Sequence, residues 1–259
     1  MLNIAIEAAQ QAGTFLKQNL GRVREIQVKQ GQEKNLVTEI DRLSERIIID
    51  MIRRHYPSHD ILAEESGSKR NTSAEYRWII DPLDGTTNYT HGFPVFCVSI
   101  AVEWKDELLL GVIYDPNYEE LFTAEKGRGA FLNGKRIKVS QIDSLNQSLL
   151  VTGFPYNIAE NPDHAIEHFV NFLIKAQAVR RMGSAAIDLA YVAAGRYEGF
   201  WEVALNPWDM AAGALMITEA GGKITDFAGS PFSIYKKEVL ASNGLVHGEM
   251  REVLTKALR

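Results

Sequence analysis

The chain has 259 residues, of which 46% are hydrophobic and 24% are charged, and its net charge is −5 at pH 7. This composition is typical of a globular protein with a large core, and the length fits one domain over residues 1–259. The acidic balance argues against a nucleic-acid-binding surface as the main function.

No apolar run is long enough to cross a membrane, and residues 1–7 lack the basic leader and long apolar segment of a signal peptide. Cys97 is the only cysteine and lies in an apolar run, so we expect a small buried thiol. These features predict a cytoplasmic protein.

Apolar residues at helical spacing predict a helix that begins near Ile4 and ends before Gly21, and a second from about Thr38 to His55. Thr38 and Asp41 resemble a capping box at the start of the second helix. The middle of the chain is rich in strand-like runs separated by turn residues. Strands are predicted over 76–80, 95–104, 108–114, 121–124, 130–132, 136–139 and 148–152, with a tight hairpin at 133–134.

The final third alternates between helices and strands. Ser184 is a candidate N-cap for one helix, and Gly221-Gly222 marks the end of another. Helices are predicted over 163–176, 184–195, 208–220 and 246–258, and strands over 178–182, 199–203, 223–226 and 239–242. This order predicts an α/β or α+β fold in which helices and sheets are layered.

The most informative segment is 78–89, where an apolar run ends in two carboxylates, Asp81 and Asp84. The proline after Asp81 holds it extended, and the chain then turns within a few residues, so both side chains can converge. Two buried anions repel unless a cation lies between them, and Mg²⁺ prefers oxygen ligands. Gly85 allows the backbone to approach a ligand closely, and Thr86 can start a helix whose amides face a phosphate.

Further acidic residues lie at the ends of predicted elements. Glu64 and Glu65 follow a strand-like approach, and Asp209 lies in the first turn of a helix rich in Ala and Gly. Taken alone, a solvated turn explains the two glutamates better than a site does. A helix-dipole contact explains Asp209, and an ordinary helix start explains Asp41. Their joint occurrence in one family pattern favours a site.

Four ordered segments resemble the inositol monophosphatase family of Mg²⁺-dependent, lithium-sensitive phosphatases. W-I-I-D-P-L-D-G-T-T-N-Y (78–89) is similar to the first signature, and N-P-W-D-M-A-A-G (206–213) with E-A-G-G (219–222) is similar to the second. A-E-E-S-G (63–67) matches the metal-binding glutamate segment, and N-L-V-T-E-I-D (35–41) matches a segment that holds a helper aspartate. The resemblance covers essentially the whole chain and implies a layered αβαβα sandwich of the inositol monophosphatase/fructose-1,6-bisphosphatase type.

The resemblance implies two to three Mg²⁺ ions. One is expected on Glu64, Asp81 and the backbone carbonyl of Leu83. A second is expected on Asp81, Asp84 and Asp209, and a third binds more loosely through Glu64 and water. Two metal ions roughly 3.5–4 Å apart stabilise both the entering and the leaving oxygen of an in-line phosphoryl displacement.

The resemblance also implies how water attacks the phosphate. Thr86 and Asp41 are expected to orient and deprotonate the water, with Glu65 in the shell behind them. The amides of Gly85 and Thr86 are expected to bind phosphate oxygens. No phosphoenzyme is needed, so Cys97 is not expected to act as a nucleophile.

Two features of the sequence bear on the substrate. Family members that act on nucleotide bisphosphates or histidinol phosphate typically carry Lys or Arg where this chain has Thr87. Glu202 matches the position where inositol phosphatases place an acid on sugar hydroxyls, and an acid there would repel a second phosphate. The resemblance therefore implies hydrolysis of inositol 1-phosphate and similar sugar or polyol phosphates. An ordinary strand carboxylate explains Glu202 about equally well.

Further pocket residues are implied by the same resemblance. Gly183, Ser184 and Ala185 resemble the segment that lines the substrate pocket, and Asp209 is expected to contact substrate as well as metal. A helix cap explains Ser184 at least as well.

Two other functions stay open at this point. A broader sugar phosphatase would also hydrolyse fructose 1,6-bisphosphate. The second is a regulatory role, because some bacterial relatives bind RNA polymerase or antitermination factors. The only sequence feature that supports it is Arg180-Arg181, and a surface or interface ion pair is a simpler explanation of these two residues. His164 and His168 have the spacing of a helical zinc pair, yet a solvated helix face explains them better. The family resemblance implies a homodimer.

Overall fold

The computed structural model describes residues 1–22, 26–28, 36–67 and 74–256. Asn35, which begins one of the family-like segments, lies outside the described residues, as do positions 257 and 258 of the predicted last helix. No helix among the described residues is long and apolar enough to span a membrane.

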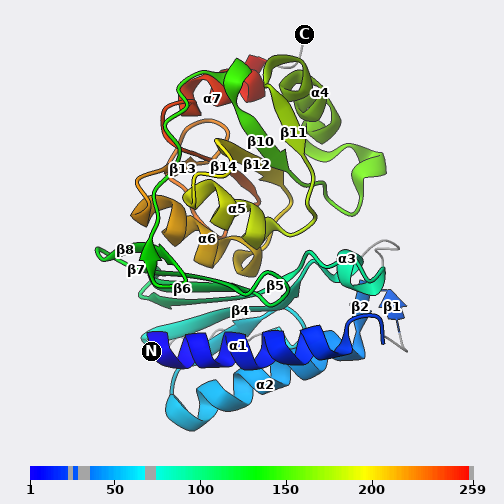
Figure 1. The fold of residues 1–259 in the computed structure, drawn as a ribbon, viewed down its shortest axis with the longest axis vertical. Coiled ribbons are helices and arrows are strands. Elements are labelled where there is room, and N and C mark those ends of the chain that lie inside the picture. Colours follow the sequence, from blue (N-terminus) through cyan, green and yellow to red (C-terminus); the bar gives the residue numbers. More distant parts are fainter. Residues whose placement is uncertain (23–25, 29–35, 68–73, 257–259) are drawn as a thin grey trace.

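Helices and sheets alternate in five layers, as Figure 1 shows. One helix pair covers the outer face of a seven-stranded sheet, a second pair lies between the two sheets, and a third pair covers the five-stranded sheet. In that order the helices are α1 (Leu2–Asn19), α2 (Glu39–His55), α5 (Ala185–Ala193), α6 (Pro207–Glu219), α4 (Ala165–Lys175) and α7 (His247–Lys256). The predicted αβαβα sandwich is confirmed.

The seven-stranded sheet follows the chain order from β3 to β9. β3 is parallel to β4, and every later neighbour pairs antiparallel. Because β4 and β5 are buried on both faces, they have apolar runs in the sequence rather than an alternating pattern. The strands are β3 (Asp60–Ala63), β4 (Tyr76–Asp84), β5 (Cys97–Trp104), β6 (Glu107–Asp115), β7 (Glu120–Glu125), β8 (Gly129–Leu132) and β9 (Lys135–Arg136).

The five-stranded sheet has the order β11-β10-β12-β14-β13. β10 is parallel to both β11 and β12, so the carboxyl ends of these three strands lie at one edge. β14 pairs antiparallel with β12 and β13. The strands are β10 (Leu149–Thr152), β11 (Ala178–Arg180), β12 (Gly199–Val203), β13 (Lys223–Thr225) and β14 (Glu238–Ser242).

Small residues allow the middle helices to pack closely on the first sheet. A Cβ atom on Gly111 of β6 would lie 2.8 Å from the Cα atom of Ala212 in α6. A Cβ atom on Gly213 would lie 2.4 Å from the Cβ atom of Leu189 in α5. The Ala- and Gly-rich sequence of α6 is therefore a packing requirement, since larger side chains would separate the layers.

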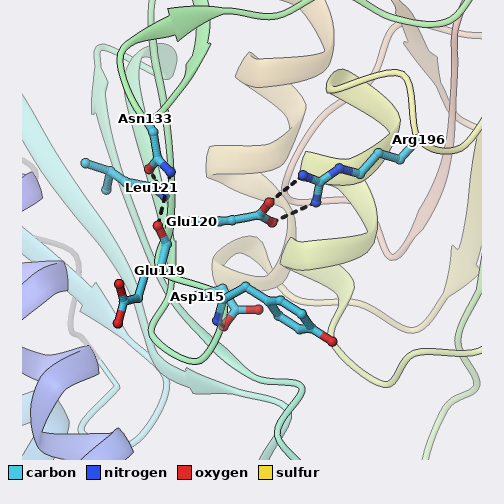
Figure 2. Close-up of polar contacts among 7 residues, drawn as sticks. Asp115, Glu119, Glu120, Leu121, Asn133 and Arg196 are labelled. Carbon is cyan, nitrogen blue, oxygen red and sulfur yellow. Dashed lines mark hydrogen bonds and ion pairs between the residues drawn. The ribbon is translucent and has the colours of Figure 1, made fainter.

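Polar contacts fix the far end of α5 to the first sheet (Figure 2). Arg196, which follows α5, forms a bidentate ion pair with Glu120 of β7. In the neighbouring predicted hairpin, the Asn133 side chain accepts a hydrogen bond from the Leu121 amide at 2.9 Å and donates one to the Glu119 carbonyl at 3.1 Å. The Arg196–Glu120 ion pair ties the end of α5 to β7, which matters because the opposite end of α5 contributes to the cavity described below.

The structure differs from the predicted elements in several places. β4 does not end at Ile80 but continues to Asp84, and the second strand of the hairpin spans only Lys135–Arg136. The short antiparallel pair β1 (Ile26–Val28) and β2 (Leu36–Thr38) was not predicted. The solvated face expected for His168 is wrong, because this side chain is 4% exposed and packs edge-on against Phe227.

Candidate active site

A cavity of about 570 Å³ opens where the carboxyl ends of β4, β10 and β12 meet the amino ends of α5 and α6. All five predicted metal ligands line it: Glu64, Asp81, Leu83, Asp84 and Asp209. The predicted substrate-binding residues also line it: Gly85, Thr86, Gly183, Ser184, Ala185 and Glu202. Asp41 and Glu65 are not part of the cavity wall, which agrees with a supporting position for both.

A bulge in β4 brings Asp81 and Asp84 to the same cavity. Asp81 pairs with Ser99 and Asp84 with Cys97, so two residues of β4 oppose one residue of β5 between these pairs. Side chains alternate along a regular strand, which would send residues three apart to opposite faces. The extra residue cancels that alternation, as bulges do near functional sites.

Asp81 lies at the centre of the negative charge. Its side chain is 2% exposed, and its pKa is raised well above the ordinary value by burial and then by the neighbouring carboxylates of Glu64, Asp84 and Asp209. Burial, followed by the charges of Glu64 and Asp84, raises the pKa of Asp209 in the same direction. No Lys or Arg in the described part of the chain forms a salt bridge with Asp81, Asp84 or Asp209.

Asp84 links the first sheet to α5. Its Oδ2 atom accepts hydrogen bonds from the Ser184 hydroxyl at 2.7 Å and from the Ala186 amide at 2.7 Å. Burial still raises the pKa of Asp84 despite these donors. Ser184 is also the N-cap of α5, because its hydroxyl accepts from the Ile187 amide at 3.3 Å. The predicted cap is therefore confirmed, and the only hydroxyl hydrogen of Ser184 points to Asp84.

Thr86 and Asp41 form the predicted pair. The Thr86 hydroxyl donates to Asp41 Oδ1 at 2.9 Å, and the Leu83 carbonyl is a second acceptor 3.2 Å away. Asp41 Oδ2 accepts from the Thr38 amide at 2.9 Å and from the Thr38 hydroxyl at 2.5 Å, which completes the predicted capping box. Both carboxylate oxygens of this buried side chain are thus held in place, and burial raises the pKa of Asp41.

Gly85 is required by the backbone at the turn after β4. Its φ is +104°, and a Cβ atom there would lie 2.9 Å from the Val95 carbonyl oxygen. It precedes α3 (Thr86–Thr90), so the predicted helix start at Thr86 is confirmed. The close approach that demands a glycine is to the chain's own backbone at Val95.

The donor set of the cavity fits Mg²⁺. The carboxylates offer only oxygen ligands, and the described Lys and Arg residues form no ion pair with Asp81, Asp84 or Asp209. They do not close into a compact cage, since no three His, Cys, Asp or Glu side chains in the described ranges form a ready metal-binding group. Mg²⁺ does not require such a cage, because it usually keeps several water ligands and binds through one or two carboxylates.

Comparisons with known proteins place this geometry in a family. The model of the "Inositol monophosphatase family" matches residues 1–259. The chain belongs to the inositol monophosphatase family. Its carboxylate-bearing segments at 63–67, 78–89 and 206–213 therefore lie inside the matched region and also around one cavity.

Relatives within the inositol monophosphatase family carry two kinds of name. The chain is 46% identical to an "Inositol-1-monophosphatase" from Synechocystis over 253 residues, covering 98% of this chain and 88% of that protein. It is 47% identical to a "Nus factor SuhB" from Pseudomonas aeruginosa over 247 residues, covering 94% and 91%. A crystal structure of the extragenic suppressor protein suhB from Bartonella henselae superposes with a TM-score of 0.93 at 40% identity, covering 99% of both chains.

Three further residues of the cavity wall bear on its chemistry but were not among the predicted site residues. Arg181, expected in a surface or interface ion pair, lines the cavity, as do Asp188 and Tyr156. Asp188 had a visible signal, since it is the only charged residue in the otherwise apolar α5. Arg181 lies in the basic pair singled out from the sequence, but only the fold brings it and Tyr156 to the site.

Proposed function

We propose that this chain is an Mg²⁺-dependent phosphatase that hydrolyses inositol 1-phosphate and similar sugar or polyol phosphates. The observation that carries the proposal is the set of carboxylates, with the buried Asp81 among them, that β4, α6 and the segment after β3 contribute to one cavity. Membership of the inositol monophosphatase family supports the same chemistry.

Metal binding is assigned to the cavity carboxylates. Glu64, Asp81 and the Leu83 carbonyl would hold one Mg²⁺, and Asp81 with Asp84 and Asp209 a second. A third, looser ion would bind through Glu64. The ions would supply Lewis-acid activation of water and neutralisation of charge on the phosphate. Glu65 lies behind this site, where its amide donates to Glu45 at 2.8 Å and its charge contributes to the raised pKa of Asp41.

The Thr86–Asp41 pair is suited to orient the attacking water. A hydroxyl has one hydrogen and two lone pairs, and Thr86 directs its hydrogen toward Asp41 and the Leu83 carbonyl. Its oxygen is then left to accept a hydrogen bond from water in the cavity. As the water attacks, its proton passes toward Thr86 and the Thr86 proton toward Asp41 Oδ1, which needs no covalent phosphoenzyme.

The two ends of the cavity suit the two ends of a polyol phosphate. The amides of Gly85 and Thr86 begin α3 and are assigned to phosphate oxygens. Glu202, with the segment from Gly183 to Ala185, lines the same cavity and is assigned to the polyol. A carboxylate accepts hydrogen bonds from hydroxyl groups and repels a second phosphate, which favours monophosphates.

Phosphate release tests the proposal. Inositol 1-phosphate, fructose 1,6-bisphosphate, adenosine 3′,5′-bisphosphate and histidinol phosphate are compared with Mg²⁺ and with EDTA. Turnover that EDTA abolishes and that is fastest on inositol 1-phosphate supports the proposal. Metal-dependent turnover that is fastest on fructose 1,6-bisphosphate favours the broader sugar phosphatase instead. Absence of turnover on all four refutes the enzymatic assignment.

Asp84→Asn tests the metal assignment within that assay. We expect it to lose most turnover, because Asp84 is assigned to the second ion. Asp115→Asn is the matched control, since Asp115 is a buried aspartate at the end of β6 that accepts from the amides of Asn117 and Tyr118 outside the cavity. Wild-type rates in Asp84→Asn would refute the two-ion assignment.

A regulatory function is a second candidate, favoured by relatives named "Nus factor SuhB" at 47% and 43% identity. A complementation experiment separates the regulatory function from the enzymatic one. The Asp84→Asn variant is expressed in a source strain from which this chain has been deleted. Growth restored by the inactive variant supports the regulatory function, and growth restored only by the active chain supports the enzyme. A homodimer and a cytoplasmic location are further proposals, drawn from the family resemblance and from the single Cys97 respectively.

A further inference from the structure

Asp188 is a buried carboxylate with one oxygen that no described residue satisfies. It lies in the first turn of α5, is 1% exposed and lines the cavity. Its Oδ1 atom is shielded from solvent and has no hydrogen-bond partner in the described part of the chain. An unsatisfied buried acceptor is unfavourable, and a carboxylate more so than a neutral group, so an apolar residue would serve the packing of α5 better.

Glu202 faces the same part of the cavity. The charge of Glu202 acts on Asp188, and Arg181 is a nearby positive charge that acts on both carboxylates. This end of the cavity thus carries two carboxylates and one guanidinium. The single positive charge of Arg181 only partly compensates the two carboxylates, which also lie within electrostatic reach of Asp84, one of the metal-binding residues assigned above.

The absence of a side chain at Gly153 provides the space that the Glu202 carboxylate occupies. β10 and β12 pair in parallel up to Thr152 and Trp201, so Gly153 and Glu202 come next at the sheet edge. A Cβ atom on Gly153 would lie 2.3 Å from each carboxylate oxygen of Glu202. The fold therefore holds the Glu202 carboxylate against the backbone at the cavity wall, on the same side of the cavity as α5.

We propose that Asp188 is a second acceptor for substrate hydroxyl groups beside Glu202, and that the pair selects ring polyols with several hydroxyl groups near one another. The proposal rests on the proposed function and deepens it. A polyol supplies O–H donors to the Oδ1 atom of Asp188, which has none among the described residues, and to Glu202 beside it, whereas a phosphate would be repelled. The phosphate is thereby directed to the Asp81 end and the polyol to the Asp188 end.

The test compares an ester rich in hydroxyls with one that has none. In Asp188→Leu, we expect KM for inositol 1-phosphate to rise roughly 10-fold to 150-fold, the loss typical of a hydrogen bond to a charged group. kcat/KM for 4-nitrophenyl phosphate should stay within about threefold of wild type, because its leaving group carries no hydroxyl for Asp188. Glu198→Gln is the matched control, since Glu198 is buried beside β12 and bonds the Leu149 amide.

Each outcome decides the proposal. Equal losses on both esters would overturn it, because Asp188 would then act on the fold or the metal end. Unchanged KM for inositol 1-phosphate would also overturn it. A series of monodeoxy inositol 1-phosphates gives a second readout: one analogue should be poorer than the parent for wild type and equal to the parent for Asp188→Leu.

Failure of the proposed function can be distinguished from failure of the Asp188 assignment. Wild type would then fail to turn over inositol 1-phosphate, with or without turnover of 4-nitrophenyl phosphate, whereas failure of the Asp188 assignment leaves wild-type turnover of both intact. Urea unfolding shows whether Asp188→Leu has a folding defect. We expect this variant to be at least as stable as wild type, because the substitution removes an unsatisfied buried carboxylate.

Discussion

Removal of the Glu202 carboxyl should make the metal-free protein more stable at high pH. Burial, with the charge of Asp84 adding to it, raises the pKa of Glu202 from 4.5 to about 8. Between these values the folded state binds more protons than the unfolded state, so this side chain lowers stability as the pH rises. Glu202→Gln carries no charge at any pH and should lose this part of the pH dependence.

The size of the effect follows from the pKa. Each pH unit between about 4.5 and 8 lowers the free energy of unfolding by up to about 1.4 kcal/mol. Ionisation of Glu202 therefore lowers it by at most ~5 kcal/mol. Because local relaxation reduces this cost, we expect the free energy of unfolding of Glu202→Gln to exceed that of wild type by roughly 2 kcal/mol or more at about pH 8.

Urea unfolding in EDTA measures this difference. The free energy of unfolding of wild type and Glu202→Gln is compared at about pH 5 and about pH 8, with equal slopes in urea as the check on two-state behaviour. The two proteins should be nearly equal at the lower pH and diverge at the higher one. A constant difference across this range would refute the burial argument for Glu202.

Three further predictions concern the turn after β4 and the ions. Thr86→Val should lower kcat by roughly 100-fold or more while Thr86→Ser keeps most of it, measured by phosphate release, because only the hydroxyl connects water to Asp41. Gly85→Ala should lower the free energy of unfolding by about 2 kcal/mol or more in urea, since the positive φ and the Val95 carbonyl both oppose a Cβ atom. Lithium should inhibit phosphate release by wild type; full activity in lithium would contradict the loosely held third ion.

Local patterns in the sequence predicted much of the fold. The capping box at Thr38, the cap at Ser184 and the strand Gly199–Val203 are present as expected, because each depends on neighbours within a few residues. β4 was predicted too short because Pro82 is uncommon inside a strand, and only the pairing with β5 shows that the strand continues through a bulge. The two-residue strand β9 likewise depends on its partner β8.

The site was predictable where motifs carry it and not elsewhere. Glu64, Asp81 and Asp209 were named from their segments, and the fold brings them to one cavity. The Thr86–Asp41 bond joins residues 45 positions apart, and the family resemblance alone suggested it. Asp188 stands out in the sequence as the one charged residue of the apolar α5, but only the structure reveals its unsatisfied oxygen.

Titration of Mg²⁺ into metal-free protein tests the central claim most directly, with wild type compared to Asp81→Asn by calorimetry and by thermal unfolding. We predict that wild type binds Mg²⁺ and gains thermal stability, because the ions bind only the folded carboxylate site. Asp81→Asn should be more stable than wild type without metal and gain nothing from Mg²⁺, since Asp81 stands at the centre of the buried charge. Equal stability without metal, together with equal Mg²⁺ binding by both proteins, would contradict the account.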